Sequence, residues 1–348
     1  MSESTIRLVY GYQNVSIKAE RSNYFECPSE EVYSPCKCFT WESSPPERND
    51  TEVEISCRTL KTDEFSLKSL FGRISDHILS TNGITRFESL RLEHTAIGEI
   101  TDSEMFGNIS FKSLDLFHNL DLSYIDLSVF NASIDTLETF CVQGSPITDE
   151  DGKFMSSITK FPKLETLILS NNELLGLNDE TFGQNIQPNL SYVDLSGNNI
   201  TKLGKRSFSK LPELHRLNLD YNQIDYISNE TFTFEIEESK LLLLFLRHNN
   251  LTGESFEPNA FTNLEKTVFL YLNNNQIKYL DEKIFKPMLD VKSDLFIALW
   301  SNPFQCDCRA KWLLEDTSYY KKRVHGIRCP DKRELWDLDE DELKCVPK

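Results

Sequence analysis

Nine cysteines are the side chains of this 348-residue chain with the most direct chemistry open to them. They form one group of four near each end, with a single cysteine between the groups: Cys27, Cys36, Cys38 and Cys57; Cys306, Cys308, Cys329 and Cys345; and Cys141. Four cysteines allow three pairings, so spacing alone leaves the connectivity of each group open. Zinc is the alternative chemistry, but zinc sites favour two-residue spacers, whereas each group here contains Cys-x-Cys. We therefore expect disulfides.

Eight Asn-x-Ser/Thr sequons supply acceptors for N-glycosylation: Asn14, Asn49, Asn108, Asn131, Asn189, Asn199, Asn229 and Asn250. Glycosylation and stable disulfides both belong to the secretory pathway, so we expect an extracellular protein, either secreted or at the cell surface. No signal peptide is present in this chain, which we interpret as an incomplete or processed start. No segment approaches the ~20 apolar residues of a membrane helix, so we expect no membrane insertion of this chain.

The sequence offers no catalytic motif: it contains no Gly-x-Ser-x-Gly, no glycine-rich phosphate loop and no His-Glu-x-x-His. His94 and His118 stand at equivalent positions in two successive copies of an internal sequence repeat. No carboxylate or cysteine stands where it would complete a metal site with them. The net charge of −18 argues against a nucleic-acid partner. The acidic run 337–342 lacks the ligand spacing of a calcium loop. We expect a protein that is not an enzyme and has no metal or cofactor.

An internal sequence repeat predicts the strands and turns that would position the side chains of this chain. Two copies show it plainly, at 190–200 (LSYVDLSGNNI) and 214–224 (LHRLNLDYNQI). Nine copies follow one another at steps of 24 to 27 residues, each with two apolar residues and then a polar one: Leu90/Leu92 with Thr95, Leu114/Leu116 with Asn119, Phe140/Val142 with Ser145, Leu167/Leu169 with Asn172, Val193/Leu195 with Asn198, Leu217/Leu219 with Asn222, Leu244/Leu246 with Asn249, Leu270/Leu272 with Asn275, and Ile297/Leu299 with Asn302. This pattern resembles the leucine-rich repeat.

Each position of the repeat has its own physical role. The apolar pair lies two residues apart and therefore points to one face of a short strand. The asparagine amide can pair backbone groups that would otherwise be buried without partners, and Thr95 and Ser145 should replace it as hydroxyl acceptors. A later apolar anchor, often phenylalanine, should fill the opposite side of the core: Phe106, Phe182, Phe208, Phe232, Phe261 and Phe285.

One repeat cannot bury its own apolar face, so the copies must stack. The fold class we predict is an α/β leucine-rich-repeat solenoid, with a curved parallel sheet on the concave face and irregular or short-helical segments on the convex side. Disulfide-stapled caps should close both ends. We place a mobile segment at 1–26, the N-terminal cap at 27–60, about nine repeats at 61–301 and the C-terminal cap at 302–348.

The cap sequences carry a more particular resemblance. Residues 302–308 (NPFQCDC) with 310–314 (AKWLL) resemble the C-terminal cap of extracellular leucine-rich-repeat proteins. That resemblance implies the pairs Cys27–Cys38, Cys36–Cys57, Cys306–Cys329 and Cys308–Cys345. The segment 27–38 (CPSEEVYSPCKC) resembles the cap of arthropod proteins related to the non-catalytic subunit of shrimp luciferase. It implies a secreted accessory or binding subunit.

Side chains that flank the apolar pairs should face outward on the concave sheet, and aromatic residues accumulate there toward the C-terminal end. We predict that a partner binds to the following concave residues: Tyr192, Asp194, Arg216, Asn218, Asp220, Leu243, Phe245, Arg247, Phe269, Tyr271, Phe296 and Trp300. Aromatic and arginine side chains on a rigid sheet are what a protein hot spot requires. For Phe296 and Trp300, the alternative is that the adjacent cap covers them. Cys141 should also face this side, where an odd cysteine suggests an intermolecular disulfide or a free thiol. The alternative is a partly shielded, inert thiol.

The expected partner is therefore another protein, with a second copy of this chain as one form of it. The family resemblance also includes guidance ligands, adhesion molecules and Toll-type ectodomains, so a receptor ectodomain is an alternative function. A third alternative is a module that recognises glycans or microbial patterns, because aromatic side chains can stack on sugars.

Overall fold

The computed structural model describes residues 27–42, 51–58, 66–81, 85–183, 185–235, 241–261, 264, 267–291, 295–343 and 345. The predicted mobile segment 1–26 and the sequons at Asn14 and Asn49 lie outside these residues.

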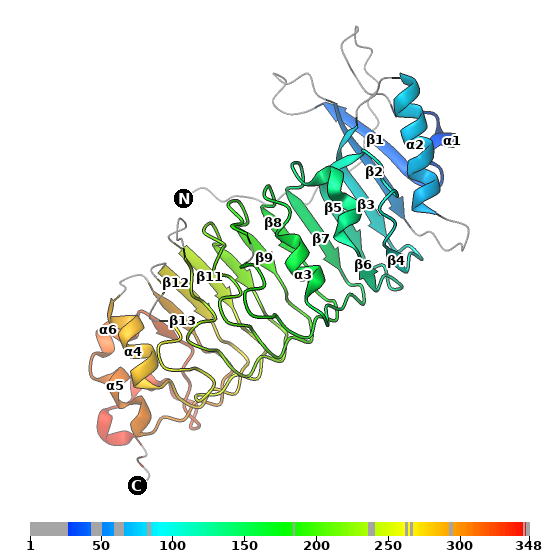
Figure 1. The fold of residues 1–348 in the computed structure, drawn as a ribbon. Helices are drawn as coiled ribbons and strands as arrows, with labels where there is room; N and C mark the ends of the chain where they lie inside the picture. The colour runs from blue at the N-terminus through cyan, green and yellow to red at the C-terminus, as the bar shows by residue number, and fades with distance from the viewer. Residues whose placement is uncertain are drawn as a thin grey trace.

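The described chain winds into a curved coil with one long sheet along its concave side (Figure 1). The sheet runs in the order β1 (Lys37–Glu42), β2 (Thr51–Arg58), β3 (Arg86–Glu93), β5 (Ser110–Phe117), β7 (Thr139–Gln143), β8 (Thr166–Ile168), β9 (Tyr192–Asp194), β10 (Arg216–Asn218), β11 (Leu241–Phe245), β12 (Thr267–Tyr271), β13 (Phe296–Ala298) and β14 (Val324–His325). The pair β1–β2 is antiparallel, and each later neighbour is parallel to the one before it. Parallel pairing follows because each copy repeats the same path.

Short helices and irregular segments cover the convex side, as the repeat length predicts. They are α2 (Leu67–Thr81), the 3-10 helix η1 (Leu127–Ser133), α3 (Lys153–Ile158) and α4 (Glu282–Val291), together with a small sheet of β4 (Glu99–Ile100) and β6 (Tyr124–Ile125). The helix α1 (Glu30–Tyr33) lies at the N-terminal end. The C-terminal end contains η2 (Cys308–Ala310), α5 (Lys311–Leu314), α6 (Thr317–Tyr320), η3 (Leu335–Asp337) and η4 (Glu340–Glu342).

A continuous apolar core runs between the two sides. Leu217 pairs in register with Val193 and Leu244, and all three side chains are completely buried. On the convex side, four of the predicted phenylalanines form a buried stack, with ring centroids about 6 Å apart: Phe182, Phe208, Phe232 and Phe261. The apolar spacing therefore predicted both walls of the core.

The repeated asparagines form a ladder inside the turn that leaves each strand. Asn222 accepts a hydrogen bond from the Ile200 N–H at 3.0 Å and donates one to the Leu195 carbonyl at 3.0 Å, both in the preceding repeat. The same two bonds recur at Asn198, Asn249, Asn275 and Asn302. Each amide thus satisfies backbone groups that are shielded from water.

The prediction that the Thr95 and Ser145 hydroxyls act as acceptors was wrong. The Thr95 hydroxyl donates to Asn119 Oδ1 at 2.7 Å instead of acting as the acceptor. The Ser145 hydroxyl is buried, and no partner for it lies among the described residues. The Ser145 N–H donates to Oδ1 of Asn172 in the following repeat at 3.1 Å.

Disulfides close both ends of the solenoid: Cys27–Cys38, Cys36–Cys57, Cys306–Cys329 and Cys308–Cys345. These are the pairs that the family resemblance implies. At the C-terminal end, Trp312 is 3% exposed and its indole N–H donates to the Leu280 carbonyl of the last repeats at 3.3 Å. The cap therefore packs on core that the final repeat would otherwise expose.

Candidate functional site

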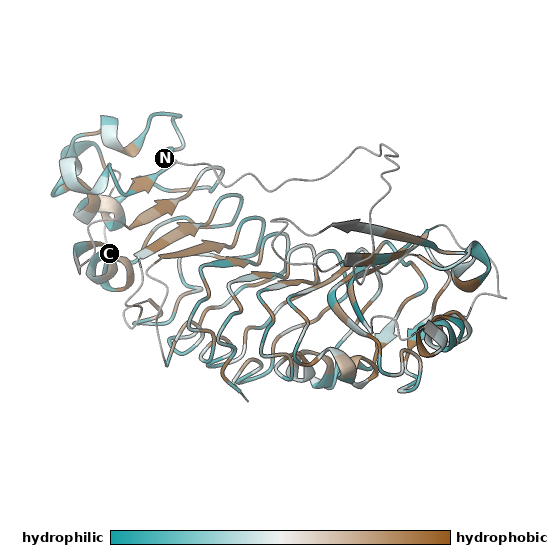
Figure 2. Ribbon diagram, turned by 90° about the horizontal axis from the view of Figure 1, so that it is seen from above, coloured by the Kyte–Doolittle hydropathy of each residue, from teal (hydrophilic) through white to brown (hydrophobic). Residues whose placement is uncertain are grey.

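Register determines which side chains share the concave face. In β10, Leu217 is buried, while Arg216 and Asn218 on either side are half-buried and point out of the sheet. Asn218 pairs with Phe245, and Phe245 pairs with Tyr271, so residues from successive repeats stand in rows across the strands. Figure 2 shows these strands on the inner side of the curve, with apolar colour concentrated in the sheet.

The structure brings the predicted aromatic residues together. We define the aromatic patch as Phe245, Phe269, Tyr271, Phe296, Trp300 and His325. Phe245 and Tyr271 stack at 4.6 Å with nearly parallel rings, and Phe296 lies 5.8 Å from both Phe269 and Tyr271. Trp300 is 47% exposed and the phenylalanines are half-buried. The C-terminal cap therefore leaves Trp300 open and covers Phe296 only in part.

His325 belongs to the patch and was missed by the sequence analysis. It lies on β14, which the cap adds to the sheet, and it pairs in register with Ala298. Its ring is 4.9 Å from Phe296 and 6.2 Å from Trp300. The only signal was the alternation Val324-His325, which is too short to predict a strand.

A polar cluster adjoins the patch on β9 and β10. Asp194 accepts hydrogen bonds from the Tyr192 hydroxyl at 2.9 Å and from the Asn218 amide at 3.1 Å. It also accepts from the Ser196 hydroxyl at 2.6 Å. Burial of the Tyr192 phenol, together with the charge of Asp194, raises the pKa of Tyr192 to about 12, so this hydroxyl remains a donor at neutral pH.

The sequence predicts Asp220 to be open to a partner on the concave face, but the structure buries it. It is 2% exposed, so a partner cannot reach it directly. It accepts a hydrogen bond from Arg247 Nε at 2.7 Å and another from the Arg247 backbone N–H at 2.6 Å. Because a buried carboxylate requires such partners, Asp220 acts as the anchor of Arg247, whose guanidinium remains on the surface.

Arg216 links the polar cluster to the aromatic patch. Its guanidinium carbon lies 5.2 Å from the ring centroid of Tyr192 and 4.9 Å from that of Phe245. This geometry is a cation–π sandwich across three strands. Arg247 also lies near the Phe245 ring, with its guanidinium carbon 5.2 Å from the ring centroid. The arrangement offers apolar, cationic and hydrogen-bonding groups side by side.

Comparison with known families addresses the fold directly. A profile of the family described as "Leucine rich repeat" matches residues 162–224 and 188–234. This segment contains β9, β10 and the Asn198 and Asn222 positions of the ladder, and the same strand and ladder pattern continues on both sides of it. The chain is a leucine-rich-repeat solenoid.

Known proteins resemble this solenoid over different lengths. The non-catalytic subunit of Oplophorus-luciferin 2-monooxygenase from Oplophorus gracilirostris is 22% identical over 343 residues, which is 94% of this chain and 89% of that protein. Mouse mimecan is 26% identical over 191 residues, which is 54% of this chain and 58% of mimecan. The structure of human trophoblast glycoprotein is 15% identical with a TM-score of 0.48, and the match covers 84% of this chain and 95% of that chain.

Two further features of the solenoid bear on chemistry. His94 and His118 stack at 5.4 Å in equivalent turns, and the described residues contain no group of three or more side chains suited to hold a metal ion. Within the same residues, no helix is long and apolar enough to cross a bilayer.

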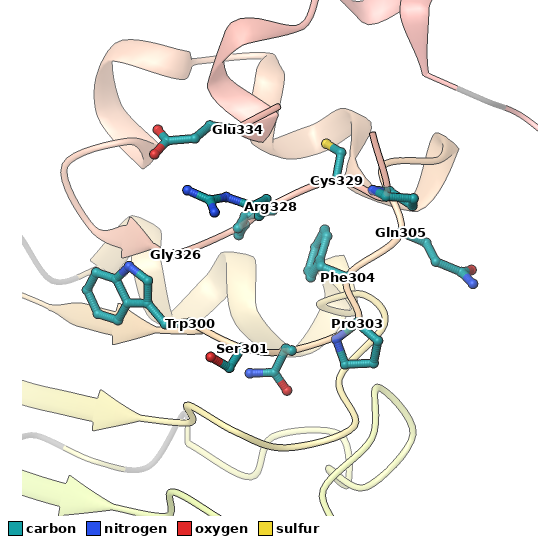
Figure 3. Close-up of a pocket in the computed structure, with 12 residues that line it drawn as sticks. Trp300, Ser301, Pro303, Phe304, Gln305, Gly326, Arg328, Cys329 and Glu334 are labelled. Carbon is teal, nitrogen blue, oxygen red and sulfur yellow. The ribbon is translucent and has the colours of Figure 1, made fainter. Parts of the chain in front are cut away.

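A cleft of about 550 Å³ opens where the C-terminal cap leaves the last strand of the solenoid. Figure 3 shows Trp300 on one side of it, with Arg328 and Glu334 contributed by the cap. Gly326 has φ of +81°, and a Cβ there would lie 2.6 Å from the Trp300 side chain, so glycine allows the ring to lie against the cap backbone. Trp300 therefore borders both the aromatic patch and this cleft.

Cys141 is a free thiol on β7, where it pairs in register with Asp115 and Ile168. It is only 3% exposed. Burial, reinforced by the charges of Asp115 and Asp194, raises the pKa of the Cys141 thiol. Because alkylation requires the thiolate, we expect iodoacetamide to label native Cys141 at least about a hundredfold more slowly at pH 8 than in unreduced, urea-unfolded protein. Mass spectrometry of the labelled peptide would measure both rates.

The sign of the pH dependence follows from this pKa. A raised pKa keeps the thiol neutral at higher pH, so native labelling should remain slow as the pH rises from 7 to 9, where an ordinary cysteine becomes reactive. Labelling of the folded protein that accelerates like that of the unfolded protein would show that Cys141 is accessible and ionisable.

Proposed function

We propose that this chain is an extracellular, non-catalytic binding module that recognises a partner protein through the C-terminal half of its concave face. The observation that carries the proposal is the aromatic patch: six ring side chains on four neighbouring strands and the turn after β13, partly exposed and in contact with one another. Contiguous exposed apolar surface of this kind is characteristic of interaction sites. The adjoining Arg216 and Arg247 add the cationic groups that hot spots favour.

Rigidity supports this function. The backbone of the patch is fixed by parallel pairing in register, and the side chains beneath it are fully buried, such as Leu244 and Leu270. The rings are also held against each other before any partner arrives. Binding therefore costs little side-chain entropy, which favours affinity.

The positions of the sequons agree with this assignment. The six that fall within the described residues, Asn108, Asn131, Asn189, Asn199, Asn229 and Asn250, all lie outside the twelve strands of the concave sheet. Glycans attached there would leave the aromatic patch open. Four disulfides support an oxidising, extracellular compartment.

Similarity to a protein named a non-catalytic subunit supports the accessory role. In this role the chain would act as a scaffold that holds its partner, and the chemistry, if any, would belong to the partner.

The test compares three forms of the protein secreted from insect cells behind a supplied signal peptide. They are wild type, a variant with Phe245→Ser, Phe269→Ser and Tyr271→Ser, and a control with Leu120→Ser, Leu175→Ser and Tyr226→Ser. The control residues are also large hydrophobic side chains and are exposed, but they lie outside the sheet. Proteins captured from conditioned medium by wild type would be identified and purified, and light scattering would report self-association.

We expect the patch variant to bind the purified partner at least about a hundredfold more weakly than wild type, because hot-spot residues each contribute tenfold or more. The control should bind as wild type does. If wild type is a dimer and the patch variant a monomer, the partner is a second copy of the chain. Equal affinity of the patch variant and wild type for every partner would refute the proposal.

A further inference from the structure

The concave face carries three arginines in the described repeats, and their pairing differs. Arg91 donates to Glu93 at 3.3 Å, and Arg247 is anchored on Asp220. Arg216 has no ion pair within the part of the chain that the structure describes, although the whole chain has an excess of 18 acidic charges. The surface nearest the aromatic patch therefore keeps a guanidinium that no internal carboxylate neutralises.

Two carboxylates of β9 and of the turn after β10, Asp194 and Asp220, are engaged by other groups. Asp194 is occupied by the Tyr192 hydroxyl, the Asn218 amide and the Ser196 hydroxyl. Asp220 is buried beneath Arg247 and bonded to it. These bonds occupy both acidic groups, and neither of them forms an ion pair with Arg216 in the part of the chain that the structure describes.

The guanidinium of Arg216 is also preorganised. Tyr192 and Phe245 hold it between their rings, and its Nε is buried without a hydrogen-bond partner among the described residues. A planar guanidinium offers a fork of donors that matches the two oxygens of a carboxylate. Since the two rings already hold the guanidinium in place, a carboxylate would bind without first ordering this side chain.

We propose that Arg216 is the receptor for a carboxylate of the partner, supplied by an acidic side chain next to an aromatic or large aliphatic one. The apolar neighbour would rest on Phe245 and Leu243, which stand beside Arg216 in the sheet. A single cation suits one carboxylate, whereas a polyanion would be repelled by the net charge of the chain. This inference rests on the proposed function and names the chemistry of its ligand.

The test uses two capped dipeptides that differ in one group. In N-acetyl-glutamyl-phenylalaninamide the glutamate is the only charge, and N-acetyl-glutaminyl-phenylalaninamide replaces it with an amide of the same shape. Ligand-observed NMR would measure the dissociation constants with wild type, Arg216→Gln, Arg216→Lys and the control Arg328→Gln. Arg328 is an exposed arginine outside the sandwich, so its substitution makes the same change in net charge.

With wild type and Arg328→Gln, we expect the glutamyl peptide to bind about tenfold more tightly than the glutaminyl peptide, the size of one charge-assisted bond. The preference should weaken with added salt. Arg216→Gln should remove it, and Arg216→Lys should restore only part, because an ammonium lacks the planar fork.

Equal binding of the two peptides to wild type, no binding of the glutamyl peptide at its solubility limit, or a preference that survives in Arg216→Gln would each overturn the inference. Failure of the proposed function is distinguishable. A partner lost by the aromatic-patch variant but retained by Arg216→Gln would refute the carboxylate and leave the function intact. If Arg216 shows the carboxylate preference but no protein partner is found, the proposed function fails and the carboxylate inference stands.

Discussion

Replacing Phe208 with alanine should lower the free energy of unfolding by about 3–5 kcal/mol. Phe208 is completely buried and stacks between Phe182 and Phe232, with centroids 6.1 and 6.0 Å away. Its removal leaves a cavity in the middle of the stack, and neighbouring repeats cannot close it without breaking their register. Urea unfolding followed by circular dichroism, with disulfides intact, would measure the change.

Phe208→Leu is the matched control, because it keeps most of the volume and should cost less than about 1.5 kcal/mol. Hydrogen exchange should place the loss of protection from Phe182 to Phe261, since each repeat of a solenoid contacts mainly its neighbours. A loss below about 1 kcal/mol in the alanine variant would show that the stack tolerates a gap, contrary to the cavity argument.

Asn222→Ala should lower the free energy of unfolding by about 2–5 kcal/mol. The amide bonds the Ile200 N–H and the Leu195 carbonyl of the preceding repeat, and it also donates to Leu219 at 3.1 Å within its own turn. Alanine would leave these backbone groups buried without hydrogen-bond partners. A buried group without a partner costs more free energy than an ordinary hydrogen bond contributes. The same urea titration would measure this loss.

Ser145→Ala provides the comparison at the equivalent position. Because the Ser145 hydroxyl has no partner among the described residues, its removal should change stability by less than about 0.5 kcal/mol. Similar losses in the two variants would mean that the ladder bonds add nothing beyond packing.

The core and the ladder could be predicted because their signals are local and repeated. The apolar pair, the asparagine and the later phenylalanine each have one role, and stacking copies multiplies it. Phe208 and Asn222 illustrate this: spacing alone gave both their burial and their neighbours.

The details of the concave face depend on cross-strand neighbours about 25 residues away, which spacing does not specify. Asp220 continues the alternation of outward-facing residues from Arg216 and Asn218, but Arg247 of the next repeat covers it. His325 joins the aromatic patch only because the C-terminal cap supplies a further strand. Cys141 stands at an outward-facing position of β7, yet it is buried between the neighbouring strands β5 and β8.

Parallel pairing in register has an immunological consequence. Neighbours on the aromatic patch, such as Phe245 and Tyr271, come from different repeats, so no linear peptide of this chain contains the surface. Antisera raised against synthetic peptides should therefore bind the unfolded chain and fail to block the folded one. A neutralising antibody against this face would have to be raised and selected on the intact, disulfide-closed protein.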